Sequence, residues 1–360
     1  MDRAMLELYT DFLITSTRLA TATGLSEVTG GQISHDKVTR FLSREEYTQE
    51  DYWKLVKPIV REIERDDGVL AIDDTIEKKP YTDENEIVCY HYDHVIGRSV
   101  KGINLLTLFY SGEAALPVRY EVVQKKEKYL DAKSGKEKRR SEKNKNELFR
   151  EMLHQVHFGN HIRYGYVVGD SWFASSENLA YIHKKLEKTF VFAMKSNRSA
   201  ALSKKDQSQG NFMPISQIEC QPGQAVPVWL KDLFIPVVLV RQTFTNEDGS
   251  SGTLFLVCND TALNADEILN LYKKRWKIEE YHKSLKQNAS LEKSPTKIVR
   301  TQQNHIFASV VAYVKLELLK MNTSLNHFAI KSKIYLAAVQ NAMAELFSLR
   351  SRLKVAVATA

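Results

Sequence analysis

The fold is constrained most by a set of short apolar runs, two of which end in a carboxylate. GVLAIDDT (68–75) and YGYVVGD (164–170) each carry such a run followed by an aspartate. Runs of this length, rich in β-branched and aromatic residues, indicate buried strands. Further strands are expected at 103–110, 116–123 and 189–196, and helices at 146–156 and 175–186. This order predicts a mixed α/β fold in which helices cover a sheet.

Both ends of the chain are predicted to be helical. Leu6, Tyr9 and Phe12 recur at helical spacing, and Ser34 stands where an N-cap of a short basic helix over 35–43 would be. Two short helices around a glycine-containing turn are compatible with a helix-turn-helix, and equally with any small helical bundle. In the second half, helices are expected at 264–288, 301–320 and 329–352.

Residues 198–262 interrupt the alternation of strands and helices. Two strand candidates, PVVLVRQTF (236–244) and TLFLVCN (253–259), flank the turn-rich segment NEDGSSG (246–252). We therefore expect a hairpin with a loose loop, inserted before the next helix.

The positive charge is concentrated in two segments. The net charge is +7, and basic residues exceed acidic ones by six in 125–145 and by six in 271–300. A phosphate-binding surface needs such clustering, although a solvated face or a mobile loop gives the same pattern. We expect 125–145 to be a mobile segment that contacts phosphates. The side chains chosen from it are Lys138, Arg139 and Arg140.

Cysteine usage and hydropathy indicate a soluble protein of the cell interior without a membrane partner. The three cysteines are far apart and odd in number, which is typical of a reducing compartment. The N-terminus lacks the features of a signal peptide, and the longest apolar stretch, 306–314, is too short to span a bilayer. Cys89, His91 and Asp93 lack a second ligand pair at zinc-finger spacing, so we expect them to form hydrogen bonds instead of a zinc site.

Three carboxylates are placed where a divalent metal ion could use them. Asp74 and Asp170 close the first and the fourth predicted strands, and strand ends are the usual position of a site in an α/β sheet. The third, Glu279, lies in the predicted helix LYKKRWKIEEYHKSLK (271–286). Asp73 competes with Asp74, because neighbouring residues of a strand face opposite ways.

The predicted helix brings one acid and three other polar side chains onto one face. At 100° per residue they share a stripe about 60° wide, whereas Glu280 lies about 100° from Glu279. An acid, two cations and a tyrosine make a poor core stripe, and they suit a face that holds a metal ion beside phosphates. The four residues of the stripe are Tyr272, Arg275, Glu279 and Lys286.

Phosphodiester cleavage is a chemistry that needs this set of side chains. In-line attack is helped by two divalent ions about 3.5–4 Å apart, one at the nucleophile and one at the leaving oxygen. Mg²⁺ prefers hard oxygen ligands and takes a few carboxylates together with water and phosphate. Each acid by itself could equally be a turn residue or a surface charge.

The spacing Tyr272-x2-Arg275-x3-Glu279-x6-Lys286 matches the Y-R-E-K signature of the IS4-type DDE transposases of bacterial insertion sequences. The chain also resembles their IS701-like subgroup in IDDTIEKKPYTDEN, VVGDSWFAS and KRWKIEEYHKSLK. The resemblance extends from about residue 10 to about residue 350, and both acid motifs and the helix occur in the family's order.

The resemblance implies roles for individual residues. Asp74, Asp170 and Glu279 would be the catalytic, metal-binding triad, with Asp74 preferred to Asp73 because the family's first acid commonly precedes threonine. Trp276 would stack near the cleaved DNA end. The residues implied to contact terminal phosphates are Tyr272, Arg275 and Lys286.

The resemblance also implies an RNase H-like catalytic core that is split by a β-rich insertion and flanked by helical regions. The expected regions are a helical DNA-binding region (1–66), the first part of the core (67–197), the insertion (198–262), the core catalytic helix (263–300) and a C-terminal helical region (301–360).

The implied activity is that of a DNA transposase. It would bind the inverted-repeat ends of its element as double-stranded DNA, cut them with two Mg²⁺ ions per site (or Mn²⁺), and join the 3′-OH ends to target DNA. A homodimer in the synaptic complex and a cytoplasmic, nucleoid-associated location in bacteria are implied as well. Two alternatives stay open, a transposase-derived DNA-binding protein without catalysis and a plain two-metal nuclease. The presence of all three acids favours catalysis.

Overall fold

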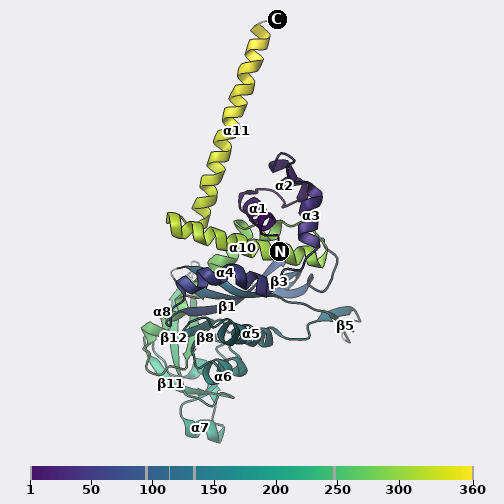
Figure 1. The fold of residues 1–360 in the computed structure, drawn as a ribbon. Coiled ribbons are helices and arrows are strands. Elements are labelled where there is room, and N and C mark those ends of the chain that lie inside the picture. The colour runs from purple at the N-terminus through teal and green to yellow at the C-terminus, as the bar shows by residue number, and fades with distance from the viewer. Residues whose placement is uncertain (1, 94–95, 113, 133–134, 246–248, 359–360) are drawn as a thin grey trace. The chain divides into compact units, whose positions relative to one another are not determined.

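The computed structural model describes residues 2–93, 96–112, 114–132, 135–245 and 249–358 (Figure 1). The chain forms two compact units. One consists of Met1–Tyr47 together with Tyr281–Ala360, and the other of Thr48–Glu280. Strands and helices alternate along the second unit, so the predicted mixed α/β class is confirmed.

The second unit is built on one large mixed sheet. Its β1 (Val69–Lys78) is parallel to β7 (Tyr166–Gly169) and antiparallel to β3 (Arg98–Ser111). β7 is parallel to β8 (Thr189–Met194), and β3 forms a hairpin with β4 (Ala115–Val122). The five strands predicted from the apolar runs are therefore all present in this sheet.

The burial pattern of β1 explains where the aspartates emerge. The first four residues, Val69 to Ile72, are completely buried, as expected of a central strand covered on both faces. Burial falls from Asp73 onward, so the strand leaves the core where its two aspartates stand. β7 ends directly before Asp170, and the parallel register pairs Ile72 with Gly169. Asp73 and Asp170 therefore follow at adjacent positions of neighbouring strands.

The hairpin predicted in 198–262 is confirmed, but it extends the main sheet. β12 (Val237–Thr245) and β13 (Ser251–Cys258) are antiparallel neighbours, and β13 also pairs with β8. The apolar pattern did not reveal the shorter elements of this region, because they bury few residues. These are β9 (Ser199–Ala201), α7 (Lys204–Gln209), β10 (Met213–Pro214) and β11 (Ala225–Leu230).

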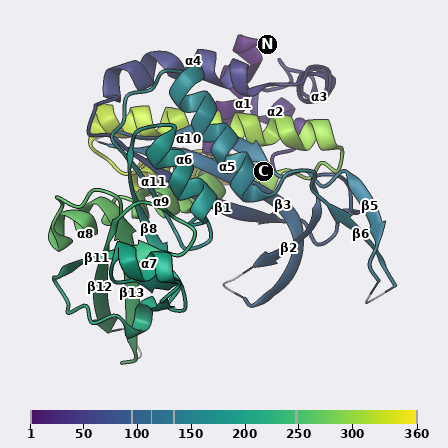
Figure 2. The same cartoon turned by 90° about the horizontal axis from the view of Figure 1, so that it is seen from below.

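Helices lie against the sheet of the second unit (Figure 2). α5 (Lys145–His154) starts with a capping box, in which the side chain of Asn144 accepts from the amide of Glu147 while Glu147 accepts from the amide of Asn144. This cap and the buried Phe149 fix the backbone of Lys145, the first residue of the helix. The other elements are α4 (Gln49–Ile63), β2 (Cys89–Asp93), α6 (Ser176–Lys184), α8 (Ala265–Lys273) and the start of α9 (Trp276–Gln287).

Much of the basic segment 125–145 forms a β-hairpin, which the sequence patterns did not predict. β5 (Glu127–Leu130) and β6 (Glu137–Arg140) form a two-stranded antiparallel sheet that extends away from the main sheet (Figures 1 and 2). Opposite charges pair between the strands, with 2.8 Å between Lys128 and Glu137 and 2.6 Å between Arg140 and Glu127. Such cross-strand pairs stabilise a hairpin. Residues 133 and 134 lie outside the described part of the chain.

The first unit consists of helices from both ends of the chain. The Tyr9 hydroxyl and His305 Nδ1 are 3.0 Å apart, and the Asn304 side chain donates to the carbonyl of Leu42. The expected N-cap is confirmed, because the Ser34 hydroxyl accepts from the amide of Lys37 at 3.3 Å. Among the described helices, none combines the length and hydropathy of a membrane span. The main helices are α1 (Arg3–Thr15), α2 (Ala22–Val28), α3 (His35–Ser43), α10 (Val299–Thr323) and α11 (His327–Ala358).

Gly102 of β3 generates a test of the β1–β3 pairing. A Cβ at this position would lie 2.3 Å from the carbonyl oxygen of Glu77. Gly102→Ala should therefore lower the free energy of unfolding by about 2 kcal/mol or more, because one strand must shift. Urea denaturation measures this, with the exposed Ser99→Ala on the same strand as a control that stays within about 0.5 kcal/mol. An unchanged stability of Gly102→Ala would contradict the pairing.

Candidate active site

Three aspartates gather where β1 and β7 leave the core. Asp73 and Asp74 belong to β1, and Asp170 follows β7 directly. The amide of Trp172 donates to Oδ1 of Asp170 at 3.0 Å, which holds this carboxylate at the strand end. Burial raises the pKa of Asp170 above its usual value. The parallel pairing of β1 and β7 thus brings together acids that are almost 100 residues apart in sequence.

Asp73 faces Asp170 and a cation from another element. One of its oxygens accepts from the amide of Asp74 at 2.8 Å, and the other lies 3.9 Å from the guanidinium of Arg275. Its side chain is 21% exposed. Burial, together with the charges of Asp74 and Asp170, raises the pKa of Asp73 to about 7.

Asp74 is held by an ammonium group. Lys145 Nζ lies 3.0 Å from one oxygen of the Asp74 carboxylate and 2.9 Å from the other. The side-chain amide of Asn104, on the neighbouring strand β3, also donates to Asp74. The Asp74 side chain is 19% exposed, so this ion pair is partly shielded from water.

Glu279 reaches the same region through Arg275. The guanidinium donates to Oε1 of Glu279 at 2.6 Å, lies 5.5 Å from the ring centroid of Tyr272, and approaches Asp73. Arg275 therefore joins one acid of α9 to one acid of β1. Glu280 points elsewhere: it pairs with Lys277 at 2.9 Å, and its side chain is 67% exposed.

The helix predicted over 264–288 is in fact broken, which is a correction to the helical-stripe argument. α8 ends at Lys273 and α9 begins at Trp276. At the break, the amides of Lys274 and Arg275 donate to carbonyls three residues back, Leu271 and Tyr272, so the turn is tighter than an α-helix. The angle of 100° per residue does not apply across this turn. Tyr272, Arg275 and Glu279 are nevertheless neighbours, as their contacts show.

The remaining predicted residues have other neighbours. Trp276 is 59% exposed and 5.9 Å from the Arg275 guanidinium. Lys286 belongs to the first unit, where its ammonium is 3.4 Å from Glu292. The three cations of the β5–β6 hairpin that were predicted to contact DNA each have an acidic partner, the pairs being Lys138–Asp131, Arg139–Glu84 and Arg140–Glu127.

The donor set fits a divalent cation by its chemistry. Carboxylate oxygens are the ligands that Mg²⁺ and Mn²⁺ prefer, and burial together with the charges of Asp74 and Asp170 raises the pKa of Asp73. Within the described residues, no group of three or more Asp, Glu, His or Cys already has the arrangement of a metal site. Two of the carboxylates form ion pairs instead, Asp74 with Lys145 and Glu279 with Arg275.

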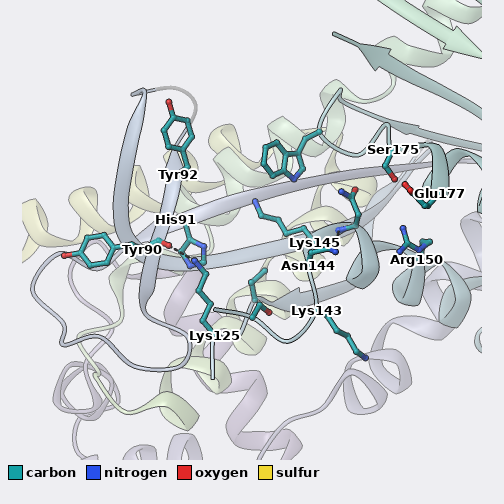
Figure 3. Close-up of a pocket in the computed structure, with 14 residues that line it drawn as sticks. Tyr90, His91, Tyr92, Lys125, Lys143, Asn144, Lys145, Arg150, Ser175 and Glu177 are labelled. Carbon is teal, nitrogen blue, oxygen red and sulfur yellow. Dashed lines mark hydrogen bonds between the residues drawn. The ribbon is translucent and has the colours of Figure 1, made fainter. Parts of the chain in front are cut away.

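A basic cavity adjoins the cluster (Figure 3). Its volume is about 590 Å³, and Lys145 stands in its wall with the ammonium 5.5 Å from the ring centroid of Trp172. His91 also lines the cavity and is only 7% exposed, with Nε2 unpaired among the described residues. Burial, together with Lys125 and Lys145, lowers the pKa of His91 to about 3, so the ring is neutral. The other cations of the wall are Lys125, Lys143 and Arg150.

Sequence reasoning missed three contacts at the site. In the sequence, Lys145 stands at the end of the basic segment 125–145, and Asn104 lies within the predicted strand 103–110. The pairing of β1 with β3 brings Asn104 to Asp74, and the capping box at the start of α5 brings Lys145 there. The capping pattern N-x-x-E at 144–147 was a readable signal for that helix start. No pattern within the chain signals which aspartate Arg275 approaches.

Comparison with known protein families gives two matches. The family described as DDE superfamily endonuclease matches residues 1–210, and the one described as Transposase DDE domain matches residues 139–315. The first match includes both aspartates of β1, and the second includes Glu279. Among curated proteins, none matches the chain.

The raised pKa of Asp73 predicts how the stability of the folded protein depends on pH. Between about pH 4 and 7 the folded protein keeps a proton on Asp73 that the unfolded chain has lost, so this residue lowers stability as the pH rises. In the presence of a chelator, Asp73→Asn should raise the free energy of unfolding at pH 8 by more than about 1 kcal/mol, and the gain should vanish near pH 4. Thermal unfolding at both pH values measures this. The exposed Asp83→Asn is the control, and an equal gain at both pH values would contradict the assignment.

Proposed function

The chain belongs to the DDE superfamily endonuclease family, and on this premise we propose that it is an IS4-type transposase with the Y-R-E-K signature. It is a nuclease-type enzyme that acts on DNA, and its family uses divalent metal ions. In the proposed reaction it binds the inverted-repeat ends of its insertion sequence, hydrolyses a phosphodiester bond at each end, and joins the 3′-OH ends to target DNA. Two Mg²⁺ ions, replaceable by Mn²⁺, serve each site.

The observation that carries this proposal is that Arg275 contacts both Glu279 of α9 and Asp73 of β1, next to the strand β7 that Asp170 follows. Asp74, Asp170 and Glu279 would hold the metal ions. Bound metal would activate the attacking water and neutralise charge on the leaving oxygen. Arg275 would orient Glu279 and grip a phosphate oxygen beside it, because a guanidinium offers parallel donors to an oxyanion.

Asp73 and Asp74 are both candidates for the first acid of the triad, and their contacts differ. Asp73 lies on the side of Arg275, and Asp74 is the carboxylate that already binds a cation on both oxygens. We retain Asp74, because a cation that contacts both of its oxygens stands where a metal ion would stand. Asp73 would then tune the charge of the site.

An RNase H-like core is proposed for residues 67–197, with 263–300 supplying the catalytic helix and 198–262 the insertion. The strand order β4-β3-β1-β7-β8, antiparallel on one side of β1 and parallel on the other, supports this core. The helical regions 1–66 and 301–360 are proposed for DNA binding and for pairing. α2 and α3, joined around Gly30 and Gly31 with positive φ, are compatible with a helix-turn-helix.

DNA would be contacted by two groups of side chains. The first is at the acids, where Tyr272 and Arg275 would meet terminal phosphates, and the exposed Trp276 would stack on a base. Lys286 is proposed for the same role by family likeness. The second is the β5–β6 hairpin, whose exposed strands would lie along the DNA backbone. Its cations are paired with acids, so the DNA would have to replace these partners.

A homodimer is proposed for the DNA-bound state, and α11 supports it. Large apolar side chains are exposed along this helix at steps of three and four residues, which is the spacing of a coiled-coil seam. The stripe consists of Leu336, Val339, Met343, Leu346 and Phe347.

The acid triad is tested by alanine variants. Asp74→Ala, Asp170→Ala and Glu279→Ala should each lower single-turnover cleavage of a terminal-repeat duplex by about a thousandfold or more, while DNA binding persists. Glu280→Ala is the matched control, because Glu280 is exposed and paired with Lys277. Loss of cleavage in Glu280→Ala with retention in Glu279→Ala would refute the assignment. Strand-transfer products distinguish a transposase from a plain nuclease, which cuts without joining.

Arg275 is tested against its neighbour Lys274. Arg275→Lys keeps the charge but loses the fork that binds Glu279, so cleavage at saturating protein should fall by about a hundredfold. Overall DNA affinity should change little, because other basic residues share it. Lys274→Ala, an exposed side chain at the break between α8 and α9, should affect cleavage far less. Equal effects of the two variants would show that Arg275 does not belong to the active face.

A further inference from the structure

Lys145 lines the basic cavity and its side chain also contacts the acid cluster. Its ammonium contacts both oxygens of Asp74, and its side chain is 24% exposed. Its backbone is fixed by the capping box at Asn144, so only the four-carbon stem is free to move. Figure 3 shows Lys145 and Lys143 among the residues that line the cavity, with the Lys143 side chain pointing away from Lys145.

The cavity next to Lys145 is suited to an anionic group. Lys125 donates to the carbonyl of Tyr90 at 2.6 Å, and Arg150 donates to the side-chain oxygen of Asn178 at 2.6 Å. Both acceptors are neutral, and the one carboxylate among the described lining residues, that of Glu177, offsets part of the charge of Arg150. The neutral, buried His91 adds an unpaired ring nitrogen to the wall. A phosphate that enters this space would attract the ammonium of Lys145 away from Asp74.

We propose that Lys145 is a resident cation of the metal site. In DNA-free protein its ammonium holds the Asp74 carboxylate. When DNA binds, the ammonium moves to a DNA phosphate in the adjoining cavity, and Asp74 becomes accessible to a divalent ion. This inference rests on the proposed function, because it takes Asp74 as a metal ligand. DNA and metal then reinforce each other's binding, and by thermodynamic linkage the reinforcement is the same in both directions. Metal-loaded, active protein would be confined to complexes with DNA.

The ammonium and the metal ion compete by charge as well as by space. The Lys145 nitrogen is within 3.0 Å of both oxygens that a metal ion would use. A positive charge that stays at this distance disfavours a second cation at the same carboxylate. Removing the charge of Lys145 should therefore strengthen metal binding in the absence of DNA, although the same substitution removes a DNA contact.

The experiment is a Mn²⁺ titration followed by electron paramagnetic resonance, with and without a duplex that lacks terminal repeats. Lys145→Gln should bind Mn²⁺ at least about tenfold more tightly than the wild type when DNA is absent, a change of about 1.4 kcal/mol. The duplex should strengthen Mn²⁺ binding in the wild type, and this gain should shrink to about twofold or less in Lys145→Gln. Lys145→Arg, which keeps the charge, should behave like the wild type.

Lys143→Gln is the matched control. Lys143 lines the same cavity and loses the same charge, but it pairs with Glu151 at 2.7 Å and not with Asp74. Its Mn²⁺ affinity without DNA should stay within about twofold of the wild type. Circular dichroism shows whether Lys145→Gln folds. If it does not, Lys145→Ala provides the same comparison.

Asp74→Asn separates failure of this inference from failure of the proposed function. If Asp74→Asn abolishes Mn²⁺ binding while Lys145→Gln binds like the wild type, the resident-cation role is wrong and the metal site stands. If Asp74→Asn leaves Mn²⁺ binding unchanged in Lys145→Gln protein, Asp74 is not a metal ligand, and both proposals are overturned. An equal gain of Mn²⁺ affinity in Lys145→Gln and Lys143→Gln would show that the gain comes from the lower net charge and not from release of Asp74. This result would also overturn the inference.

Discussion

The structure depends on the repulsion between carboxylates that the sheet brings together, and on the two basic side chains that offset it. Parallel pairing of β1 with β7 places Asp170 beside the two aspartates of β1. The resulting proximity, with burial, keeps the pKa of Asp73 near 7. Arg275 and Lys145 each form an ion pair with a member of the cluster.

The two cations come from elements that fix them differently. Arg275 stands in the tight turn between α8 and α9 and reaches acids of two elements, so it links α9 to strand β1. Lys145 stands at a capped helix start and faces both Asp74 and the basic cavity. One cation is therefore placed to hold the cluster together, and the other to leave it when an anion arrives.

The sequence predicted the parts of this site that depend on local patterns, and not those that depend on tertiary pairing. The apolar runs before Asp74 and Asp170 were sufficient to predict buried strands that lead to acids, because burial of a central strand requires such runs. The expected end of the first strand at Asp74 is wrong, because β1 continues to Lys78 in its pairing with β3. The break at Lys274 was not predictable, since residues 271–286 contain neither Gly nor Pro, the residues that interrupt helices most strongly. The ion pair of Lys145 with Asp74 depends on how α5 lies on the sheet, which no local spacing encodes.

The central claim is that Asp74, Asp170 and Glu279 bind the catalytic metal ions. The most direct measurement is anomalous diffraction from Mn²⁺ in crystals of the protein bound to a terminal-repeat duplex. We expect anomalous peaks within coordination distance of all three carboxylates, with the Lys145 ammonium displaced toward a phosphate. Mn²⁺ bound at Asp73 while Lys145 still holds Asp74, or bound away from these acids altogether, would contradict the account.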